Sequence, residues 1–206
     1  MKKVLVLDFG GQYNLLVARR VRECGVYCEI KSFRLSMDEI RAFGPDALIL
    51  TGGPATVFEP NAPMVDKALF EMGIPVLGIC YGQQLMMQLL GGQGRKAETR
   101  EYGKIQLTHT ASPLFAGVPE TSVCWMSHGV EVERLAPGFA VVATTEGCGF
   151  AAVANDSRRL YGVQFHPEVL HTEYGTQVLQ NFLYRVCGFG PEWTMALSLI
   201  HISEPT

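Results

Sequence analysis

A cysteine between two glycines stands where an apolar run gives way to a helix-like run. Residues 74–79 are strand-like, Cys80 follows them, and residues 84–90 have the pattern of a helix. Gly-x-Cys-x-Gly at such a junction is typical of a nucleophile elbow, a turn so sharp that a Cβ at Gly78 or Gly82 would collide with neighbouring backbone. The sulfur would then lie at the carboxyl end of a strand and at a helix N-terminus, which favours the thiolate. The alternative is a buried structural cysteine, but the two glycines favour a reactive one.

A reactive thiol needs a base and a group that orients the base. His166 follows an apolar strand, so we expect it at the same edge of the sheet as Cys80. Glu168 lies two residues further on, on the same side of an extended chain, and Pro167 favours an extended residue before it. These residues predict a Cys80, His166, Glu168 triad, although a polar turn would explain the last two alone. His171 and His166 share no helical face, so we expect no metal.

Acyl transfer also needs donors for the oxyanion that develops during attack. The backbone N–H of Tyr81, directly after the cysteine, is one candidate. Gly53, in the Gly-Gly-Pro loop after the neighbouring strand, offers a second N–H with no side chain in the way. Such a loop can also cradle phosphate, but it matches the phosphate fingerprints poorly.

Length and composition limit the class of protein. A chain of 206 residues is one ordinary α/β domain, or one domain with a remnant of another, and its net charge of -3 gives no basic surface for nucleic acid. No apolar run reaches the roughly 20 residues of a membrane span. The six cysteines show no framework spacing, which predicts reduced thiols and a cytoplasmic location.

Strands and helices alternate through the first half of the chain, as in a parallel sheet with right-handed crossovers. A capping box at Ser36 opens one of the helices. Before the cysteine we predict strands at 3–7, 26–31, 47–50 and 74–79, and helices at about 15–24, 36–43 and 63–72.

After Gly92 the pattern changes to short strands with hardly any helix, which predicts antiparallel strands beside the parallel core. A helix at about 173–186 would close the domain, and residues 189–206 complete no pattern. We therefore predict one domain at 1–188, and at 189–206 a truncated linker start and a non-native tail. The later strands are predicted at 104–109, 122–126, 140–144, 150–153 and 160–165.

Three motifs together resemble the class I (triad) glutamine amidotransferases, and more narrowly the amidotransferase domains of glutamine-hydrolysing GMP synthases. The resemblance covers residues 1 to about 188 and implies an open, mostly parallel, flavodoxin-like sheet with helices on both faces. The class motifs are Gly78-Ile79-Cys80-Tyr81-Gly82-Gln83-Gln84, Gly52-Gly53-Pro54 and His166-Pro167-Glu168. The narrower match rests on residues 7–13 with 18–23, 101–103, 125–129 and 166–172.

The resemblance implies hydrolysis of glutamine to glutamate and ammonia through a glutamyl thioester on Cys80. It makes Gly53 and Tyr81 the oxyanion donors and assigns Gln84 to the amino-acid end of the substrate. A Ser127-His128 loop would line the same pocket.

The resemblance also implies a partner. Ammonia would pass to an ATP pyrophosphatase (synthetase) domain, absent from this chain, that converts XMP to GMP in purine nucleotide biosynthesis. ATP and Mg would belong to that domain, with no cofactor in this one and a homodimeric full-length enzyme. The family usually has Ser-His-Gly-Asp where this chain has Val130, so a polar contact would be lost.

Three alternatives differ in function. A glutaminase subunit for anthranilate or aminodeoxychorismate synthesis keeps the fold, and residues 12–13 and 171–172 disfavour it. A non-catalytic regulatory module would have a silenced triad, and the intact set argues against it. A thiol peptidase or chaperone is disfavoured by Gln84 together with the glycine loop.

Overall fold

The computed structural model of the chain describes residues 1–193. Its strands are β1 (Lys3–Asp8), β2 (Tyr27–Ser32), β3 (Ala47–Leu50), β4 (Val76–Ile79), β5 (Gln93–His109), β6 (Thr121–Arg134), β7 (Ala140–Thr144), β8 (Ala152–Asn155) and β9 (Leu160–Val163). Its α-helices are α1 (Asn14–Glu23), α2 (Met37–Phe43), α3 (Tyr81–Leu89) and α4 (Gly175–Gln180). The 3₁₀ helices η1 (Lys67–Glu71) and η2 (Pro113–Phe115) and the π-helix η3 (Asn181–Val186) complete the set. Residues 194–206 of the predicted tail lie outside the described residues.

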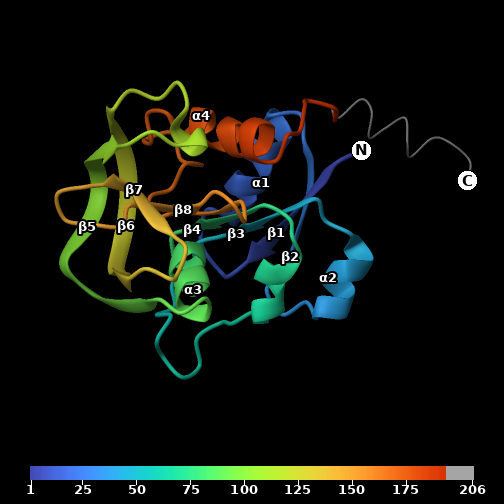
Figure 1. Cartoon of the computed structure of the whole chain (residues 1–206), viewed down its shortest axis with the longest axis horizontal. Coiled ribbons are helices and arrows are strands. Elements are labelled where there is room, and N and C mark those ends of the chain that lie inside the picture. Colours follow the sequence, from blue (N-terminus) through green and yellow to red (C-terminus); the bar gives the residue numbers. More distant parts are fainter. Residues whose placement is uncertain (194–206) are drawn as a thin grey trace, which may run out of the picture.

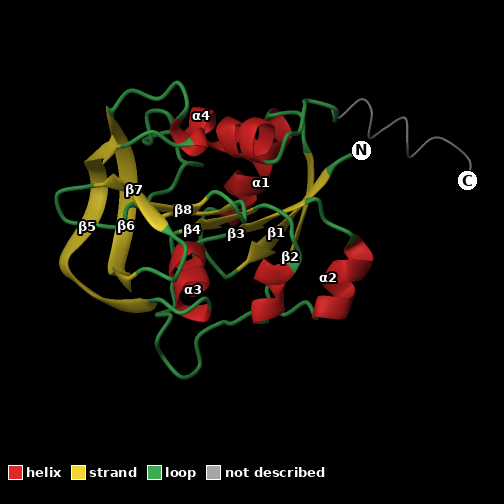
Figure 2. Cartoon of the chain, viewed as in Figure 1, coloured by secondary structure: helices red, strands yellow, loops and turns green. Residues whose placement is uncertain are grey.

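Within residues 1–193, the strands form one nine-stranded sheet in the order β2-β1-β3-β4-β9-β8-β7-β5-β6 (Figure 1). The strands from β2 to β9 in this order pair in parallel, and those from β9 to β6 pair antiparallel. Helices cover both faces of the parallel part, while β5 and β6 extend beyond it (Figure 2). The predicted α/β fold with a parallel core and an antiparallel extension is confirmed.

The central parallel strands β1, β3, β4 and β9 are buried on both faces, because a helix layer lies on each side, whereas the edge strand β2 is largely half-buried. Val4 and Val6 of β1 pack in one cluster with α1 and the C-terminal helical segment. Leu5 and Leu7 point to the other side and pack in a second cluster with α2, η1 and α3. This two-sided burial explains why the strands read as continuous apolar runs instead of alternating ones.

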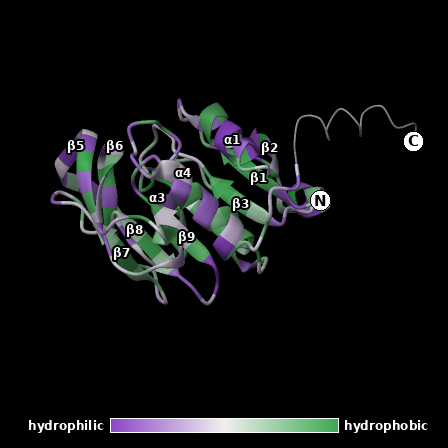
Figure 3. Cartoon of the chain, turned by 90° about the horizontal axis from the view of Figure 1, so that it is seen from above, coloured by the Kyte–Doolittle hydropathy of each residue, from purple (hydrophilic) through white to green (hydrophobic). Residues whose placement is uncertain are grey.

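β5 and β6 follow a different rule. In β6, buried and half-buried residues alternate from Ser122 to Gly129, so one face of this strand is covered and the other is partly exposed to solvent. In β5, exposed and half-buried residues predominate, and only Gly94, Glu101 and Leu107 are buried. Seen from above, these two strands alternate between hydrophilic and hydrophobic residues, whereas β1 and β3 are largely hydrophobic (Figure 3).

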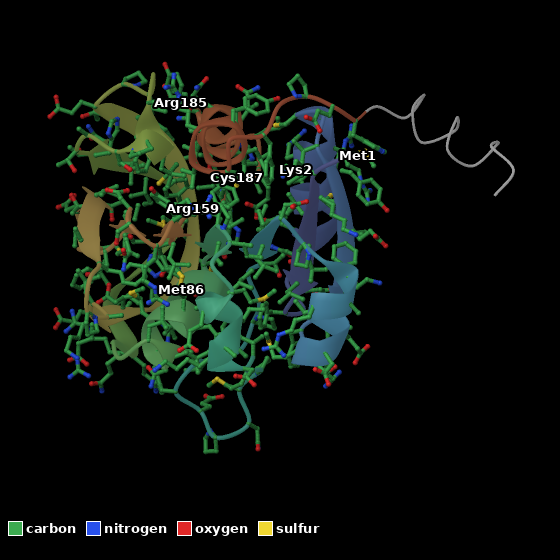
Figure 4. The ribbon with its side chains drawn as sticks, turned by 45° about the vertical axis from the view of Figure 1, so that its right-hand side comes forward. Met1, Lys2, Met86, Arg159, Arg185 and Cys187 are labelled. Carbon is green, nitrogen blue, oxygen red and sulfur yellow. The ribbon has the colours of Figure 1, made fainter. Side chains whose placement is uncertain are left out.

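The helix termini follow local sequence rules. Ser36 caps α2 with a complete capping box, as predicted, and Gly44 ends that helix with a left-handed φ of 67°. Figure 4 shows the difference between the inner and outer sides of the helices. Met86 on α3 lies among packed side chains and is buried, whereas Arg185 lies at the outside of η3 and is exposed.

Several predicted bounds are wrong. The predicted strands at 104–109 and 122–126 are parts of β5 and β6, which have 17 and 14 residues. Their polar ends lack an apolar run, and only pairing with each other makes them strands. Ser127 and His128 therefore lie within β6 and not in a loop.

Two other elements are shorter than predicted. The helix expected at 63–72 is the 3₁₀ helix η1, which begins where the side chain of Asp66 accepts a hydrogen bond from the N–H of Ala68. β9 ends at Val163, because the chain leaves its ladder and the N–H of His166 donates to the carbonyl of Trp125 in β6.

The last described residues pack on the domain. The N–H of Trp193 donates to the carbonyl of Gly25 (2.7 Å), and its ring lies 5.9 Å from that of Tyr27. The predicted domain boundary at 188 stays a prediction. None of the helices within residues 1–193 has the length and apolar composition of a membrane span.

Candidate active site

Cys80 occupies a sharp turn between β4 and α3. Its φ of 54° and ψ of −108° lie in a region that L-residues rarely adopt. A Cβ on Gly78 would lie 2.6 Å from the carbonyl oxygen of Gly82, and one on Gly82 would lie 2.4 Å from that of Leu50. The glycines predicted on steric grounds are therefore required, and the turn stores strain on the order of 1–3 kcal/mol.

The sulfur of Cys80 differs in its surroundings from the other five thiols. It faces the side-chain Nε2 of Gln164 at 3.5 Å and the carbonyl of Ser127 at 3.9 Å. All six cysteines lie in the described part of the chain and none forms a disulfide. Burial raises the pKa of Cys24 and Cys28 to about 11 and that of Cys124 and Cys148 to about 12, and it also raises that of Cys187.

His166 and Glu168 form a buried pair at the same edge of the sheet. Nδ1 of His166 lies 2.6 Å from Oε1 of Glu168. Burial opposes the charged imidazolium, but interactions with Cys80 and with Glu168 outweigh it and raise the pKa of His166 to about 10. Among the described residues, Oε2 of Glu168 has no hydrogen-bond partner. The structure thus brings together the three residues predicted as a triad.

Neighbouring elements hold the loop that carries this pair. The hydroxyl of Thr172 donates to the carbonyl of His166 (2.6 Å) and accepts from the N–H of Trp125 (3.0 Å). Nε of Arg20, on α1, donates to the carbonyl of Glu168 (3.0 Å). These contacts fix the position of the imidazole relative to β6 and α1.

The glycine loop after β3 lies against the nucleophile. A Cβ on Gly52 would lie 3.1 Å from Cε1 of His166 and 3.5 Å from Cβ of Cys80. One on Gly53 would lie 2.4 Å from the carbonyl oxygen of Phe9, so no side chain fits there, and a side chain at Gly52 would press on the imidazole of His166. Tyr81 is the first residue of α3, and its N–H has no acceptor within the helix.

These elements surround a cavity of about 530 Å³, a size usual for small-molecule sites. Its wall on the parallel side comes from the loops after β1 and β3, and β5 and β6 form the opposite wall with the cations Lys96 and Arg100. The predicted residues that line the cavity are Gly53, Cys80, Gln84, Ser127, His128, His166 and Glu168.

The predicted substrate residues are largely engaged within the protein. Nε2 of Gln84 donates to the carbonyl of Val130 (2.9 Å) and to Oε1 of Gln164 (3.1 Å). Both ring nitrogens of His128 have partners, the carbonyl of Val130 (3.1 Å) and Oε1 of Glu101 (3.1 Å). Position 130 thus serves the site through its backbone oxygen, whatever its side chain.

One buried group has the residue types of a metal site. Ligand atoms of Glu101, His128 and Cys148 lie within 4.8 Å of one another. However, Glu101 already accepts hydrogen bonds from the hydroxyl of Thr145 at 3.0 and 2.9 Å, and burial raises the pKa of Cys148 to about 12, which disfavours a thiolate ligand. These contacts explain the cluster as a hydrogen-bonded support for β5 and β6.

Sequence reasoning missed Gln164, Lys96 and Arg100. Gln164 is two residues from His166, and its place at a strand end was a usable signal. The two cations carried no signal, because only the pairing of β5 with β6 brings them to the cavity.

Comparison with known proteins gives consistent matches. The family model for glutamine amidotransferase class-I matches residues 5–186. The chain is 54% identical over 191 residues to the GMP synthase [glutamine-hydrolyzing] of Caldicellulosiruptor saccharolyticus, covering 92% of this chain and 37% of that protein. It is 55% identical over 195 residues to that of Agathobacter rectalis, covering 94% and 37%. The chain therefore spans about two fifths of the length of these curated relatives.

Solved structures agree in fold. A protein from Thermoplasma acidophilum, described as one subunit of a GMP synthase, has a TM-score of 0.83 and 30% identity, covering 98% of both chains. A glutamine amidotransferase from Thermotoga maritima has a TM-score of 0.71 over 91% of this chain and 99% of its own, at 18% identity, and supports the fold alone.

Proposed function

Because the chain belongs to the class I glutamine amidotransferase family, we propose that it hydrolyses glutamine to glutamate and ammonia at Cys80. The observation that carries this proposal is the strained cysteine at the cavity, beside a histidine whose Nδ1 lies 2.6 Å from a buried carboxylate. A thiol, a base and an orienting acid in this order are the groups that acyl transfer requires.

Two half-reactions follow from these groups. The thiolate of Cys80 attacks the carboxamide carbon, the C–S bond forms, and the carbonyl π electrons move to oxygen. His166 gives a proton to the amide nitrogen, so ammonia leaves with the electrons of the C–N bond. Water then attacks the thioester, His166 takes its proton, and the C–S bond breaks to return the thiolate.

The oxyanion of each tetrahedral intermediate would be held by backbone N–H groups. We assign this role to Gly53, in the loop after β3, and to Tyr81, the first residue of α3, directly after the nucleophile. Gln84, Ser127 and His128 line the cavity and would contact the amino-acid end of the substrate. The reaction needs no cofactor in this domain.

The first test is release of glutamate from glutamine by the chain, measured at steady state. Labelling with a glutamine-analogue electrophile and peptide mass spectrometry should place the adduct on Cys80. An adduct on another cysteine would contradict the assignment of the nucleophile.

We further propose that this chain is the glutaminase part of a GMP synthase. The support is about 54% identity to relatives of that name over more than nine tenths of this chain. Ammonia would pass to an ATP pyrophosphatase domain that uses ATP and Mg to convert XMP to GMP. Glutaminase subunits for anthranilate or aminodeoxychorismate synthesis are the alternative, and these relatives favour GMP synthesis.

Coupling to the partner can be measured. A thiol that reacts without an acceptor wastes glutamine, and a misplacement of about 1 Å costs roughly a hundredfold in rate. We expect slow hydrolysis by the chain alone and a faster rate when a matching synthetase domain with XMP and ATP is titrated in. A full rate without the partner would contradict the coupling but not the glutaminase activity.

The whole protein is proposed to be a cytoplasmic homodimer, as the family resemblance implies. The unpaired thiols of all six cysteines suit a reducing compartment. Sedimentation of the whole protein tests the dimer, and fluorescence imaging of a tagged copy tests the location.

A further inference from the structure

Gln164 is a fully buried glutamine that contacts the sulfur of Cys80. It directly follows β9, its backbone N–H donates to the carbonyl of Ala151 (2.8 Å), and its side-chain Nε2 lies 3.5 Å from Sγ. The triad and the oxyanion donors leave this contact without a role. A buried amide aimed at the reacting atom is a candidate for one.

The orientation of this amide follows from a chain of hydrogen bonds. The carbonyl of Val130 can only accept, so the group of Gln84 that faces it must be its NH₂. The second hydrogen of that NH₂ then faces the Gln164 side chain, which must present its oxygen. The nitrogen of Gln164 is left to face the sulfur of Cys80. The backbone carbonyl thus fixes both amides, and a flipped Gln164 would set donor against donor.

We propose that Gln164 is a catalytic residue whose side-chain N–H donates to the sulfur of Cys80 and stabilises its thiolate. This inference rests on the proposed glutamine hydrolysis. A neutral donor is suited to the task, because it stabilises negative charge without becoming a competing acid. It also fixes one side of the sulfur, so that a lone pair on another side is free to attack.

The same contact acts when the thioester breaks. Water adds to the thioester carbon and loses a proton to His166, and the tetrahedral intermediate collapses by breaking the C–S bond. The bonding electrons go to sulfur, and the N–H of Gln164 donates to the thiolate as it forms. Gln164 would therefore assist both formation and departure of the sulfur anion.

The test is the pH dependence of Cys80 alkylation by iodoacetamide in the whole chain, followed by peptide mass spectrometry. Gln164→Met keeps a long buried side chain but has no N–H. We expect its alkylation midpoint to rise by about one pH unit, which means about tenfold less thiolate below the midpoint. The kcat for glutamine should fall by about the same factor.

Gln83→Met is the matched control. Gln83 is the same residue type, is equally buried, and its Nε2 donates to the carbonyl of Phe150 (2.9 Å), away from the sulfur. We expect this variant to lose comparable stability and to keep the wild-type alkylation midpoint. Equal midpoints in the Gln164→Met, Gln83→Met and wild-type proteins would overturn the proposal.

Two further measurements cover the case in which Gln164→Met does not fold. Gln164→Glu keeps the shape and the bond from Gln84, and its carboxylate should raise the midpoint further. In the unmodified protein, the side-chain amide signal of Gln164 in NMR should shift with the alkylation midpoint, and a signal that does not move contradicts the contact. Alkylation needs no glutamine, so a wild-type chain that fails to hydrolyse glutamine would refute the proposed function separately.

Discussion

β4 has four residues, all buried, whereas β5 has 17 and exposes about every second side chain. Both serve the same cavity, since β4 leads into Cys80 and β5 carries Lys96 and Arg100. The parallel strands end in loops that carry Cys80, Gly53 and His166, and helices on both faces hold those strands in place. β5 and β6, in the antiparallel part of the sheet, contribute backbone oxygens and two cations.

The difference separates two tasks. Reacting atoms must be placed to within a fraction of an ångström, which a strand buried between two helix layers provides. The opposite wall must admit and release a substrate, and the antiparallel pair of β5 and β6, with one solvent-exposed face, is suited to this. We therefore expect changes in the parallel half to alter kcat or folding, and changes in β5 and β6 to alter mainly KM.

The largest expected effect is that of Cys80→Ala. Loss of the nucleophile should reduce glutamate release at least about 10³-fold, with a folded domain. Cys124→Ala, in β6, is the control: its buried thiol is a packing group, so activity should persist with a loss of about 1 kcal/mol in stability. Equal activity of both variants would remove the functional distinction between the two regions.

Glu168→Gln comes next, with an expected loss of about a hundredfold in kcat, because the imidazole loses its charged partner. The same variant should change how stability depends on pH. The pKa of His166 in the folded protein is about 10, above the ordinary value of 6.5, so its protonation stabilises the fold fully below pH 6.5. That stabilisation is lost as the pH rises through 10. Urea unfolding should therefore find the wild type more stable than the variant at pH 6, and the difference should shrink toward pH 10.

Gly82→Val tests the elbow itself. Its Cβ would lie 2.4 Å from the carbonyl oxygen of Leu50, and we expect a loss of about 1–3 kcal/mol together with a fall in kcat. Gly149→Ala is the control, since a Cβ there has open space and no positive φ. A Gly82→Val protein with the wild-type melting temperature and activity would show that the elbow geometry is wrong.

The smallest effect is expected on the other wall. Arg100 lines the cavity from β5, and a charge-assisted hydrogen bond to the substrate carboxylate contributes about 1.5–3 kcal/mol. Arg100→Gln should raise KM about tenfold with little change in kcat. Arg134→Gln, on β6 but outside the cavity lining, should leave both unchanged. If Arg100→Gln lowered kcat without changing KM, the proposed division of tasks between the parallel strands and the β5–β6 pair would be wrong.

The sequence predicted the parallel half well because its rules are local. Two glycines around Cys80, a capping box at Ser36 and short apolar runs each specify a structure within a few residues. β5 and β6 were predicted too short, because their polar ends become strands only through pairing across tens of residues. The position of Gln164, two residues before His166, could have marked it as a site residue, but its role could not be predicted, because that role depends on Gln84 and on a backbone carbonyl far along the chain.

A library of variants sorted only for heat resistance would drift toward glycine at position 80. The backbone there has φ 54° and ψ −108°, which glycine adopts freely and any side chain adopts under strain. Sorting for stability alone would thus enrich folded proteins that have lost their nucleophile. Directed evolution of this domain therefore needs a selection for turnover in every round, because at position 80 glycine would favour thermal stability whereas catalysis requires cysteine.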